Sequence, residues 1–381
     1  MQNNSTTNSS KASTFFPNLQ IIRGIAAILV VLNHIYSKES FFPSIQTQPY
    51  EEYFVNFGVS GLTLFFCLSG FLITYILLNE KQHSDTINIK KFYLRRVLRI
   101  WPLYFVMIII GQFILPYFVD SNFEGGDIHS FFALKSLLYL VFLPNYVFFI
   151  FQPHNPFIDV TWSIGTEEQF YFFWPHCIKR VKSLVTLCII LILLQIIAEL
   201  FTTQLNIVKG TSTLYFIINK VIKTIEWSKA GYFGLGAVSA IIYQNKLLLD
   251  NKIITRIIKV SPFLFAITFL LNANYFFPCQ FMLLGLSYCC FQLALLDKFK
   301  GINEPLNKVF QWLGKISYSV YLWHCIVIVF VLKWFTQFNI VNTPFISILL
   351  YFSILSITLV TATISYHLIE APFLKFKDRL N

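Results

Sequence analysis

The sequence predicts an all-α membrane protein, a polytopic helical bundle of about ten transmembrane helices. One further apolar segment, residues 131–150, is expected to be re-entrant or interfacial. Hydrophobic residues make up 56% of the 381-residue chain and charged residues only 12%, about half the share found in soluble domains. The mean hydropathy is +0.63. The apolar residues form long blocks rather than amphipathic stripes, which is typical of helices surrounded by lipid.

A helix needs about 20 apolar residues to cross a bilayer. The candidate crossings are 18–36, 57–79, 93–117, 161–178, 183–203, 228–245, 256–273, 278–296, 312–335 and 343–369.

The ends of the chain have a different composition from the blocks. We expect residues 1–16, which are polar and low in complexity, to be a disordered cytoplasmic tail. Residues 17–373 then form a single membrane domain, and residues 374–381 form a short basic cytoplasmic tail. The first apolar block follows the polar tail without a cleavable signal peptide, so it is expected to remain as an anchor.

The positively charged residues predict the orientation of the bundle. Lysines and arginines cluster between apolar blocks, as in cytoplasmic loops. Most of them fall on the cytoplasmic side of the membrane if both termini are cytoplasmic and the 131–150 segment returns to the side from which it enters. A full crossing there would instead place Lys179, Arg180 and Lys182 outside. The net charge of +11 therefore reflects membrane topology and contact with membrane lipids, and we expect no nucleic-acid partner.

The first apolar block contains two ionisable residues, Arg23 and His34. They are eleven positions apart, which is about 16 Å along a helix and close to three turns, so both lie on one face. An imidazole at that depth can accept a proton from a hydroxyl, which makes His34 a candidate catalytic base. The alternative is an interfacial histidine in contact with lipid headgroups.

The third block opens with three arginines, Arg95, Arg96 and Arg99. Arg96 and Arg99 are one helical turn apart and can bind one phosphate together. The alternative is an ordinary cluster of positive charge at the cytoplasmic end of a helix.

The segment TWSIGTEEQFYFFWP carries two adjacent carboxylates, Glu167 and Glu168, shortly after Trp162 and Ser163. The carboxylates point about 100° apart on a helix, so at most one can face a given partner. One of them could orient a catalytic histidine. The alternative is an interfacial ion pair, and the sequence does not choose between the two glutamates.

Other polar residues in the apolar blocks have weaker signals. Ser69 and Gly70 precede Phe71 in a glycine-containing stretch that favours close helix packing over a nucleophilic serine. For His324 and Glu370 a structural role is at least as good an interpretation as a chemical one.

Taken together, six motifs resemble the membrane acyltransferase 3 family. They occur in order between residues 19 and 373: RGIA…H, FFCLSGFLI, RRVLRIWPLY, WSIGTEEQFY, ISYSVYLWH and YHLIEAP. The resemblance implies about ten membrane helices with cytoplasmic termini and transfer of acyl groups, most often acetyl, from cytoplasmic acyl-CoA. Family acceptors are hydroxyls of surface polysaccharides, peptidoglycan, lipids or small natural products.

The family pattern also implies roles for particular residues. The Arg-x10-His pattern falls on Arg23 and His34, and the Arg-x-x-Arg pattern falls on Arg96 and Arg99. A serine-glycine-phenylalanine motif falls on Ser69, Gly70 and Phe71. A carboxylate after Trp162 and Ser163 falls on Glu167 or Glu168. Tyr321, His324 and Glu370 belong to the last two motifs.

These patterns lead us to expect a bacterial inner-membrane O-acetyltransferase. Acetyl-CoA would be the donor, held by Arg23, Arg95, Arg96 and Arg99, and His34 would be the general base or the acyl acceptor. The expected acceptor is a surface polysaccharide or lipid-linked glycan such as lipopolysaccharide O-antigen, with a lipid or a small natural product as the alternative. We expect no metal and no permanently bound cofactor. Some family members carry an appended SGNH-type domain; none is evident here, so a second transfer step is expected to need another protein or to be absent.

A proton-coupled transporter or flippase is the competing class. In that case His34 and the glutamates Glu167 and Glu168 would form a proton relay. Such transporters more often show an inverted repeat with broken helices, and we find no internal repeat in the sequence.

Overall fold

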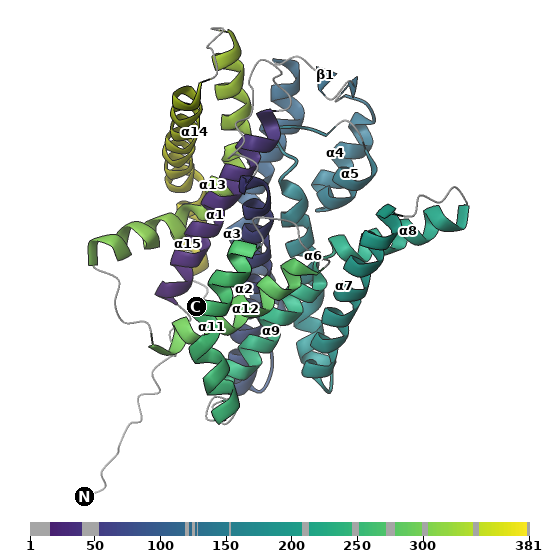
Figure 1. The fold of residues 1–381 in the computed structure, drawn as a ribbon, viewed down its shortest axis with the longest axis vertical. Helices are drawn as coiled ribbons and strands as arrows, with labels where there is room; N and C mark the ends of the chain where they lie inside the picture. The colour runs from purple at the N-terminus through teal and green to yellow at the C-terminus, as the bar shows by residue number, and fades with distance from the viewer. Residues whose placement is uncertain are drawn as a thin grey trace, which may run out of the picture.

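The computed structural model describes residues 16–39, 53–118, 122–123, 126–127, 129–151, 154–207, 213–245, 251–271, 279–298, 304–337 and 343–378. The regular structure in this part of the chain is helical apart from a small antiparallel ladder between β1 (Asn122–Phe123) and β2 (Gly126–Asp127). The helices form an elongated bundle in which α8 and the α4–α5 hairpin project to one side (Figure 1). The expected tail 1–16 lies outside the described residues except for Phe16, as do residues 379–381 of the basic tail.

The longer helices follow the apolar blocks of the sequence. They are α1 (Pro17–Glu39), α2 (Tyr53–Ser84), α3 (Ile89–Ile108), α6 (Thr161–Arg180), α7 (Leu184–Ile207), α11 (Lys252–Leu271), α12 (Gln280–Lys298), α13 (Glu304–Gln337) and α14 (Pro344–Ser365). Shorter elements connect or extend them: η2 (Ile109–Ile114), η3 (Leu115–Tyr117), α4 (Phe132–Leu140), α5 (Pro144–Ile150), α8 (Thr213–Trp227), α9 (Ala230–Gln244), η4 (Tyr366–Glu370) and α15 (Ala371–Asp378).

Within the described residues, seven helical segments are long and apolar enough to cross a membrane. They are Pro17–Tyr36, Phe57–Ser84, Ile89–Tyr117, Leu184–Thr203, Lys252–Leu271, Asn307–Gln337 and Phe345–Phe376. Each overlaps a crossing predicted from the sequence, so the all-helical membrane class is confirmed.

The other three predicted crossings correspond to α6, α9 and α12. The helix α9 has 15 residues, a rise of about 22 Å against a hydrocarbon core of about 30 Å. The apolar part of α12 is Gln280–Leu296, which is also short. The helix α6 has 20 residues, but the glutamates and Gln169 in its middle keep its hydropathy low. The total of about ten crossings therefore stays a prediction.

The segment 131–150 folds into the two short helices α4 and α5. Phe142 adopts a left-handed φ of 59° between them, and Pro144 begins α5. Proline cannot donate the backbone hydrogen bond that a continuous helix needs, so the break falls at this position. With nine residues, α4 rises only about 14 Å. The segment therefore does not form a single crossing helix.

The helices α2 and α13 lie at the centre of the bundle, and α1 packs against both of them. The packing of α2 on α9 depends on Gly70 and Gly236. A Cβ on Gly70 would overlap the backbone carbonyl of Phe233, and a Cβ on Gly236 would overlap that of Cys67. Glycine at these two positions allows the helix backbones to approach closely. The sequence-based interpretation of Gly70 as a packing residue agrees with this contact.

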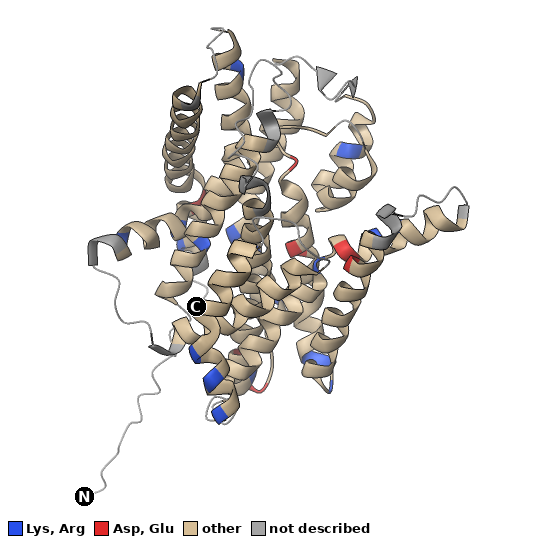
Figure 2. Cartoon of the chain, in the orientation of Figure 1, with Lys and Arg blue, Asp and Glu red and all other residues tan. Residues whose placement is uncertain are grey.

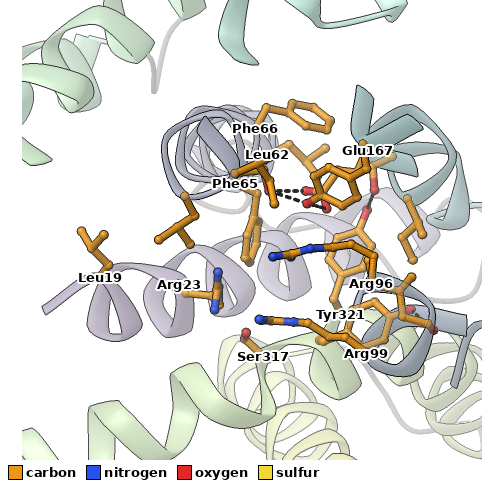
Figure 3. A pocket seen from close by; sticks show the side chains of 18 of the residues that line it. Leu19, Arg23, Leu62, Phe65, Phe66, Arg96, Arg99, Glu167, Ser317 and Tyr321 are labelled. Atoms are coloured by element: carbon orange, nitrogen blue, oxygen red, sulfur yellow. Dashed lines mark hydrogen bonds between the residues drawn. The ribbon is translucent and has the colours of Figure 1, made fainter. Parts of the chain in front are cut away.

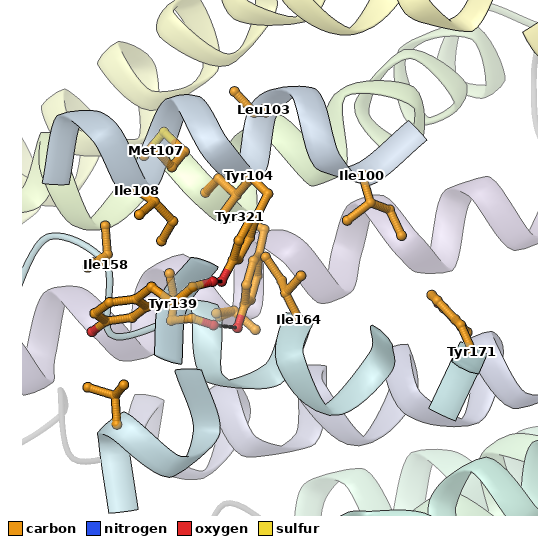
Figure 4. Packing of buried hydrophobic residues seen from close by; sticks show 14 of the residues in the cluster. Ile100, Leu103, Tyr104, Met107, Ile108, Tyr139, Ile158, Ile164, Tyr171 and Tyr321 are labelled. Atoms are coloured by element: carbon orange, nitrogen blue, oxygen red, sulfur yellow. Dashed lines mark hydrogen bonds between the residues drawn. The ribbon is translucent and has the colours of Figure 1, made fainter. Parts of the chain in front are cut away.

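A large buried cluster connects α3 with α4, α6 and α13 (Figure 4). Its tyrosines also satisfy backbone groups: the Tyr104 hydroxyl donates to the carbonyl of Tyr139 at 2.7 Å, and Tyr321 donates to the carbonyl of Val160 at 3.0 Å. Buried donors of this kind are costly unless paired. The first hydrogen bond therefore ties α4 to α3, and the second ties the start of α6 to α13.

The periphery of the bundle carries apolar side chains, as expected for a lipid-facing surface. Phe263 on α11 is 71% exposed and Phe352 on α14 is 67% exposed. The basic side chains lie mostly in the lower half of the bundle in the view of Figure 2. Such an uneven distribution is typical of one cytoplasmic and one outer end.

Candidate functional site

A cavity of about 300 Å³ lies between α1, α2, α3, α6 and α13. We call it the arginine cavity. Its polar lining residues are Gln20, Arg23, Ser69, Arg96, Arg99, Ser163, Glu167, Tyr171, Ser317, Tyr318 and Tyr321. Apolar side chains such as Phe65 and Leu62 complete the wall (Figure 3).

Three guanidinium groups converge on this space. Arg23 reaches it from α1, whereas Arg96 and Arg99 reach it from α3 (Figure 3). Arg23 donates to the side-chain oxygen of Gln20 at 3.3 Å, and the Arg96 guanidinium lies 5.5 Å from the ring centre of Tyr171. The spacing of Arg96 and Arg99, one turn apart on α3, places both on the same face.

The balance of charge in the arginine cavity is positive. Among the residues that the structure describes, Glu167 is the one carboxylate that lines it against the three arginines. Guanidinium groups with planar donor forks bind phosphate and carboxylate oxygens, often two bonds at a time. The cavity is therefore suited to an anionic ligand. Arg95, which the sequence analysis groups with the other arginines, does not line the cavity. It precedes Arg96 and therefore lies about 100° around the helix from it.

Glu167 is held by two hydroxyl groups. Ser69 donates to its Oε1 at 3.0 Å, and the Tyr171 hydroxyl lies 2.8 Å from its Oε2 and 3.0 Å from the Ser69 oxygen. Tyr171 was not singled out from the sequence, although it lies four residues after Glu167 and hence on the same helical face. These contacts join α2 to α6 across the cavity.

Glu168 points away from the arginine cavity. Its Oε2 accepts a hydrogen bond from the Trp101 indole at 3.2 Å, and its Oε1 is buried with no hydrogen-bond partner among the described residues. The two glutamates thus face different neighbours, as their positions on a helix require. Of the two glutamates, Glu167 is the one that lines the cavity with the arginines.

His34 lies outside the arginine cavity, further along α1 than Arg23. Its Nδ1 is 2.9 Å from the carbonyl oxygen of Val30. A carbonyl only accepts, so Nδ1 carries the hydrogen, and the lone pair of a neutral ring is on Nε2. Nε2 is the atom that can accept a proton. The hydrogen-bond partners of Glu167 are Ser69 and Tyr171, and that of Glu168 is Trp101. The ring that lies against His34 is that of His324.

His324 connects His34 to the cavity. It is fully buried on α13, with its ring centre 4.9 Å from that of His34 and 5.7 Å from that of Tyr321. Tyr321 lines the arginine cavity, and its hydroxyl is 2.7 Å from that of Ser163. The side chains of Tyr321 and His324 therefore link the cavity wall to His34 through ring contacts.

The remaining residues from the sequence motifs lie elsewhere in the bundle. Phe71 packs with Tyr75 in an aromatic cluster below Gly70. Glu370 is buried in η4 and accepts a hydrogen bond from Ser319. Trp162 faces away from the arginines, toward Trp227. These three side chains do not line the arginine cavity.

Comparisons with known proteins agree with the motif order. The family model described as an acyltransferase domain, acyltransferase 3, matches residues 16–367. A protein named "Putative O-acetyltransferase SACOL0978" from Staphylococcus aureus (strain COL) is 26% identical over 388 residues, covering 96% of this chain and 58% of the relative. Peptidoglycan O-acetyltransferase OatA of Listeria monocytogenes serovar 1/2a is 26% identical over 387 residues, covering 95% of this chain and 56% of the relative.

The chain spans less than three fifths of the length of these curated relatives. No solved structure matches it. The family match covers nearly the whole membrane bundle, including α1, the arginine cavity and His324. The chain therefore belongs to the acyltransferase 3 family of membrane acyltransferases.

Proposed function

We propose that this protein is a membrane O-acetyltransferase that moves an acetyl group from cytoplasmic acetyl-CoA to a hydroxyl of a glycan on the outer side of the membrane. The observation that carries the proposal is the convergence of Arg23, Arg96 and Arg99 on one cavity, connected through Tyr321 and His324 to His34.

The donor binds at the arginine cavity in this proposal. Coenzyme A carries phosphates, and three guanidinium groups compensate for negative charge where water is partly excluded. The cavity of about 300 Å³ is too small for the whole donor, so it holds the arginine-bound part and the arm that leads toward Tyr321. The rise of about 16 Å from Arg23 to His34 is comparable with an extended pantetheine arm.

His34 carries the chemistry in this proposal. Its Nε2 takes the proton of the acceptor hydroxyl as that oxygen attacks the thioester carbonyl. The C–S bond then breaks, the proton is passed to the departing sulfur, and the products are the O-acetyl ester and free CoA. In the second version, Nε2 attacks the thioester first, and the acceptor hydroxyl then takes the acetyl group from the imidazole.

The orientation follows from the basic residues. We assign the end of the bundle that holds most of them to the cytoplasm, which places both termini there and His34 toward the outer side. Donor and acceptor then approach from opposite faces of a bacterial plasma membrane.

The acceptor class is supported by the relatives. The name of the Listeria protein refers to peptidoglycan, so we favour a cell-wall glycan over the lipopolysaccharide O-antigen expected from the sequence alone. A lipid or a small natural product would use the same donor chemistry.

The test is a transfer assay with protein in lipid nanodiscs. The protein is incubated with isotopically labelled acetyl-CoA and un-acetylated cell-wall fragments released by a muramidase, and products are analysed by mass spectrometry. We expect labelled O-acetyl esters that are lost on mild alkaline treatment. Release of CoA without any labelled glycan would overturn the acceptor assignment, and failure to bind or consume acetyl-CoA would overturn the donor assignment.

A further inference from the structure

A second cavity, of about 590 Å³, lies beside the arginine cavity. We call it the tryptophan cavity. Residues of α2, α6, α7, α8, α9 and α12 line it, together with residues of the turns next to them. Its size falls within the range of about 300–1,000 Å³ that is typical of sites for small molecules. The proposed chemistry of the arginine cavity does not use it.

The two cavities share a wall and lie at different levels of the bundle. Leu62 and Phe66 line both. Along α2, the tryptophan cavity begins at Val59, whereas the arginine cavity extends to Ile76. A Cβ on Gly58 would meet the side chain of Asn33, so this end of α2 is level with His34 on α1. The tryptophan cavity is thus on the acceptor side of the arginine cavity.

The charges of the two cavities have opposite sign. Two carboxylates, Glu199 and Glu226, line the tryptophan cavity against one ammonium group, that of Lys229. Three arginines and one carboxylate line the arginine cavity. A phosphate-bearing donor is therefore repelled from the tryptophan cavity, and a neutral ligand with hydroxyl groups is not.

The hydrogen-bonding groups of the tryptophan cavity are held in place. The hydroxyl of Tyr232 and the amide of Gln195 both donate to Oε1 of Glu199, at 2.6 Å and 2.9 Å. The carboxylate is thereby anchored through Oε1 in the wall of the cavity. The Thr202 hydroxyl is buried with no hydrogen-bond partner among the described residues, which is costly unless a ligand or water supplies one.

Aromatic rings supply the flat part of the wall. The rings of Trp162 and Trp227 are 4.8 Å apart at an angle of 68° and form a corner. The turn that presents Trp227 contains Lys229 at a left-handed φ of 51°, a strained conformation for a residue with a side chain. The C–H bonds of a pyranose ring pack on the negative face of an indole.

We propose that the tryptophan cavity is a carbohydrate subsite that binds sugar units of the acceptor glycan. Trp162 and Trp227 pack against the ring faces, and Glu199 and Thr202 bind hydroxyl groups. This inference rests on the proposed glycan O-acetyltransferase function and assigns the acceptor to a site separate from that of the donor.

The test measures glycan binding without requiring turnover. Radiolabelled chitotetraose, an uncharged β-1,4 oligomer of N-acetylglucosamine, is equilibrated by dialysis with protein in lipid nanodiscs. Nanodiscs are needed because maltoside detergents carry a sugar headgroup that would compete. We expect Glu199→Gln and Trp227→Ala each to raise the Kd for chitotetraose at least about tenfold, the effect of losing about 1.4 kcal/mol, and Thr202→Val to raise it less.

Matched controls separate this inference from the donor site. Thr224→Val, on the exposed face of α8, and Trp334→Ala, an exposed position on α13, should leave glycan affinity unchanged. Acetyl-CoA binding should be the same in every variant. The carbohydrate subsite would be overturned if all three cavity variants kept the glycan affinity of the wild type. It would also be overturned if the wild type bound no chitotetraose and phospholipid alone occupied the cavity. Failure of the wild-type protein to bind acetyl-CoA would instead refute the proposed function.

Discussion

The imidazole ring of His34 lies against that of His324, with ring centres 4.9 Å apart and planes inclined by 57°. The two residues are 290 positions apart in the sequence and meet because α1 packs along α13. His324 is fully buried, so it supports one side of the His34 ring. The Val30 carbonyl fixes the tautomer of His34. The pair holds Nε2 of His34 in one orientation, which general-base catalysis requires.

Replacement of His34 tests its role directly. We expect His34→Gln to lower kcat for glycan acetylation by about 10²- to 10⁴-fold, the usual contribution of a general base. Expression and thermal stability should change little, because the side chain is only partly buried. The matched control is His83→Gln: His83 is on α2, makes the same kind of bond from Nδ1 to the carbonyl four residues earlier, and is exposed. Transfer activity retained by His34→Gln would refute this role.

The arginine cavity predicts a selective effect on the donor. Each arginine that binds a donor phosphate contributes about 1.5–3 kcal/mol, so Arg99→Ala should raise the KM for acetyl-CoA by about 10- to 100-fold. Arg99→Lys should restore only part of the affinity, because an ammonium group lacks the planar donor fork. The neighbouring variant Arg95→Ala is the control, since Arg95 does not line the cavity. Steady-state kinetics over a range of acetyl-CoA concentrations measure these effects. Equal KM values for the Arg99 and Arg95 variants would contradict donor binding at this cavity.

Several features of the fold could be predicted from local sequence. Long apolar blocks identify the crossing helices because a lipid environment demands about 20 apolar residues in a row. The spacing of Arg96 and Arg99 predicts a shared face, and both side chains do line the same cavity. The apolar block 131–150 also stands out as different from the others. Its break at Phe142 and Pro144 could have been predicted from the proline.

Other features depend on tertiary packing and carry no local signal. The sequence shows two adjacent glutamates, but the rotation of α6 against α2 decides that Glu167 meets Ser69 while Glu168 meets Trp101. The contact of His34 with His324 similarly depends on the register of α1 on α13. The sequence does not predict the tryptophan cavity, because the residues that line it come from six helices and no spacing in the sequence relates these helices to one another.

The two glutamates should respond differently to neutralisation. Glu167→Gln removes the one carboxylate beside three arginines, so the attraction of the cavity for donor phosphates should increase and the KM for acetyl-CoA should fall. At the same time kcat should fall, because glutamine keeps only one accepting oxygen, so one of the hydroxyls of Ser69 and Tyr171 loses its acceptor. Glu168→Gln changes the contact with Trp101 outside the cavity and should therefore alter the KM less. A rise in KM for Glu167→Gln would show that the carboxylate supports donor binding instead of opposing it.

The close contact of α2 with α9 predicts a stability effect that is separate from chemistry. In Gly70→Ala the new methyl group would overlap the carbonyl group of Phe233, and backbone atoms cannot rotate away as a side chain can. Such overpacking costs about 1–3 kcal/mol, so the thermal unfolding temperature should decrease. The control is Gly285→Ala on α12, where the nearest atoms belong to side chains of Leu235, Cys67 and Tyr232 at 3.2–3.3 Å and can adjust. Thermal unfolding in nanodiscs compares the two variants. If Gly70→Ala were as stable as Gly285→Ala, α2 and α9 would not be packed as closely as described, and Ser69 would lose the rigid support that positions it beside Glu167.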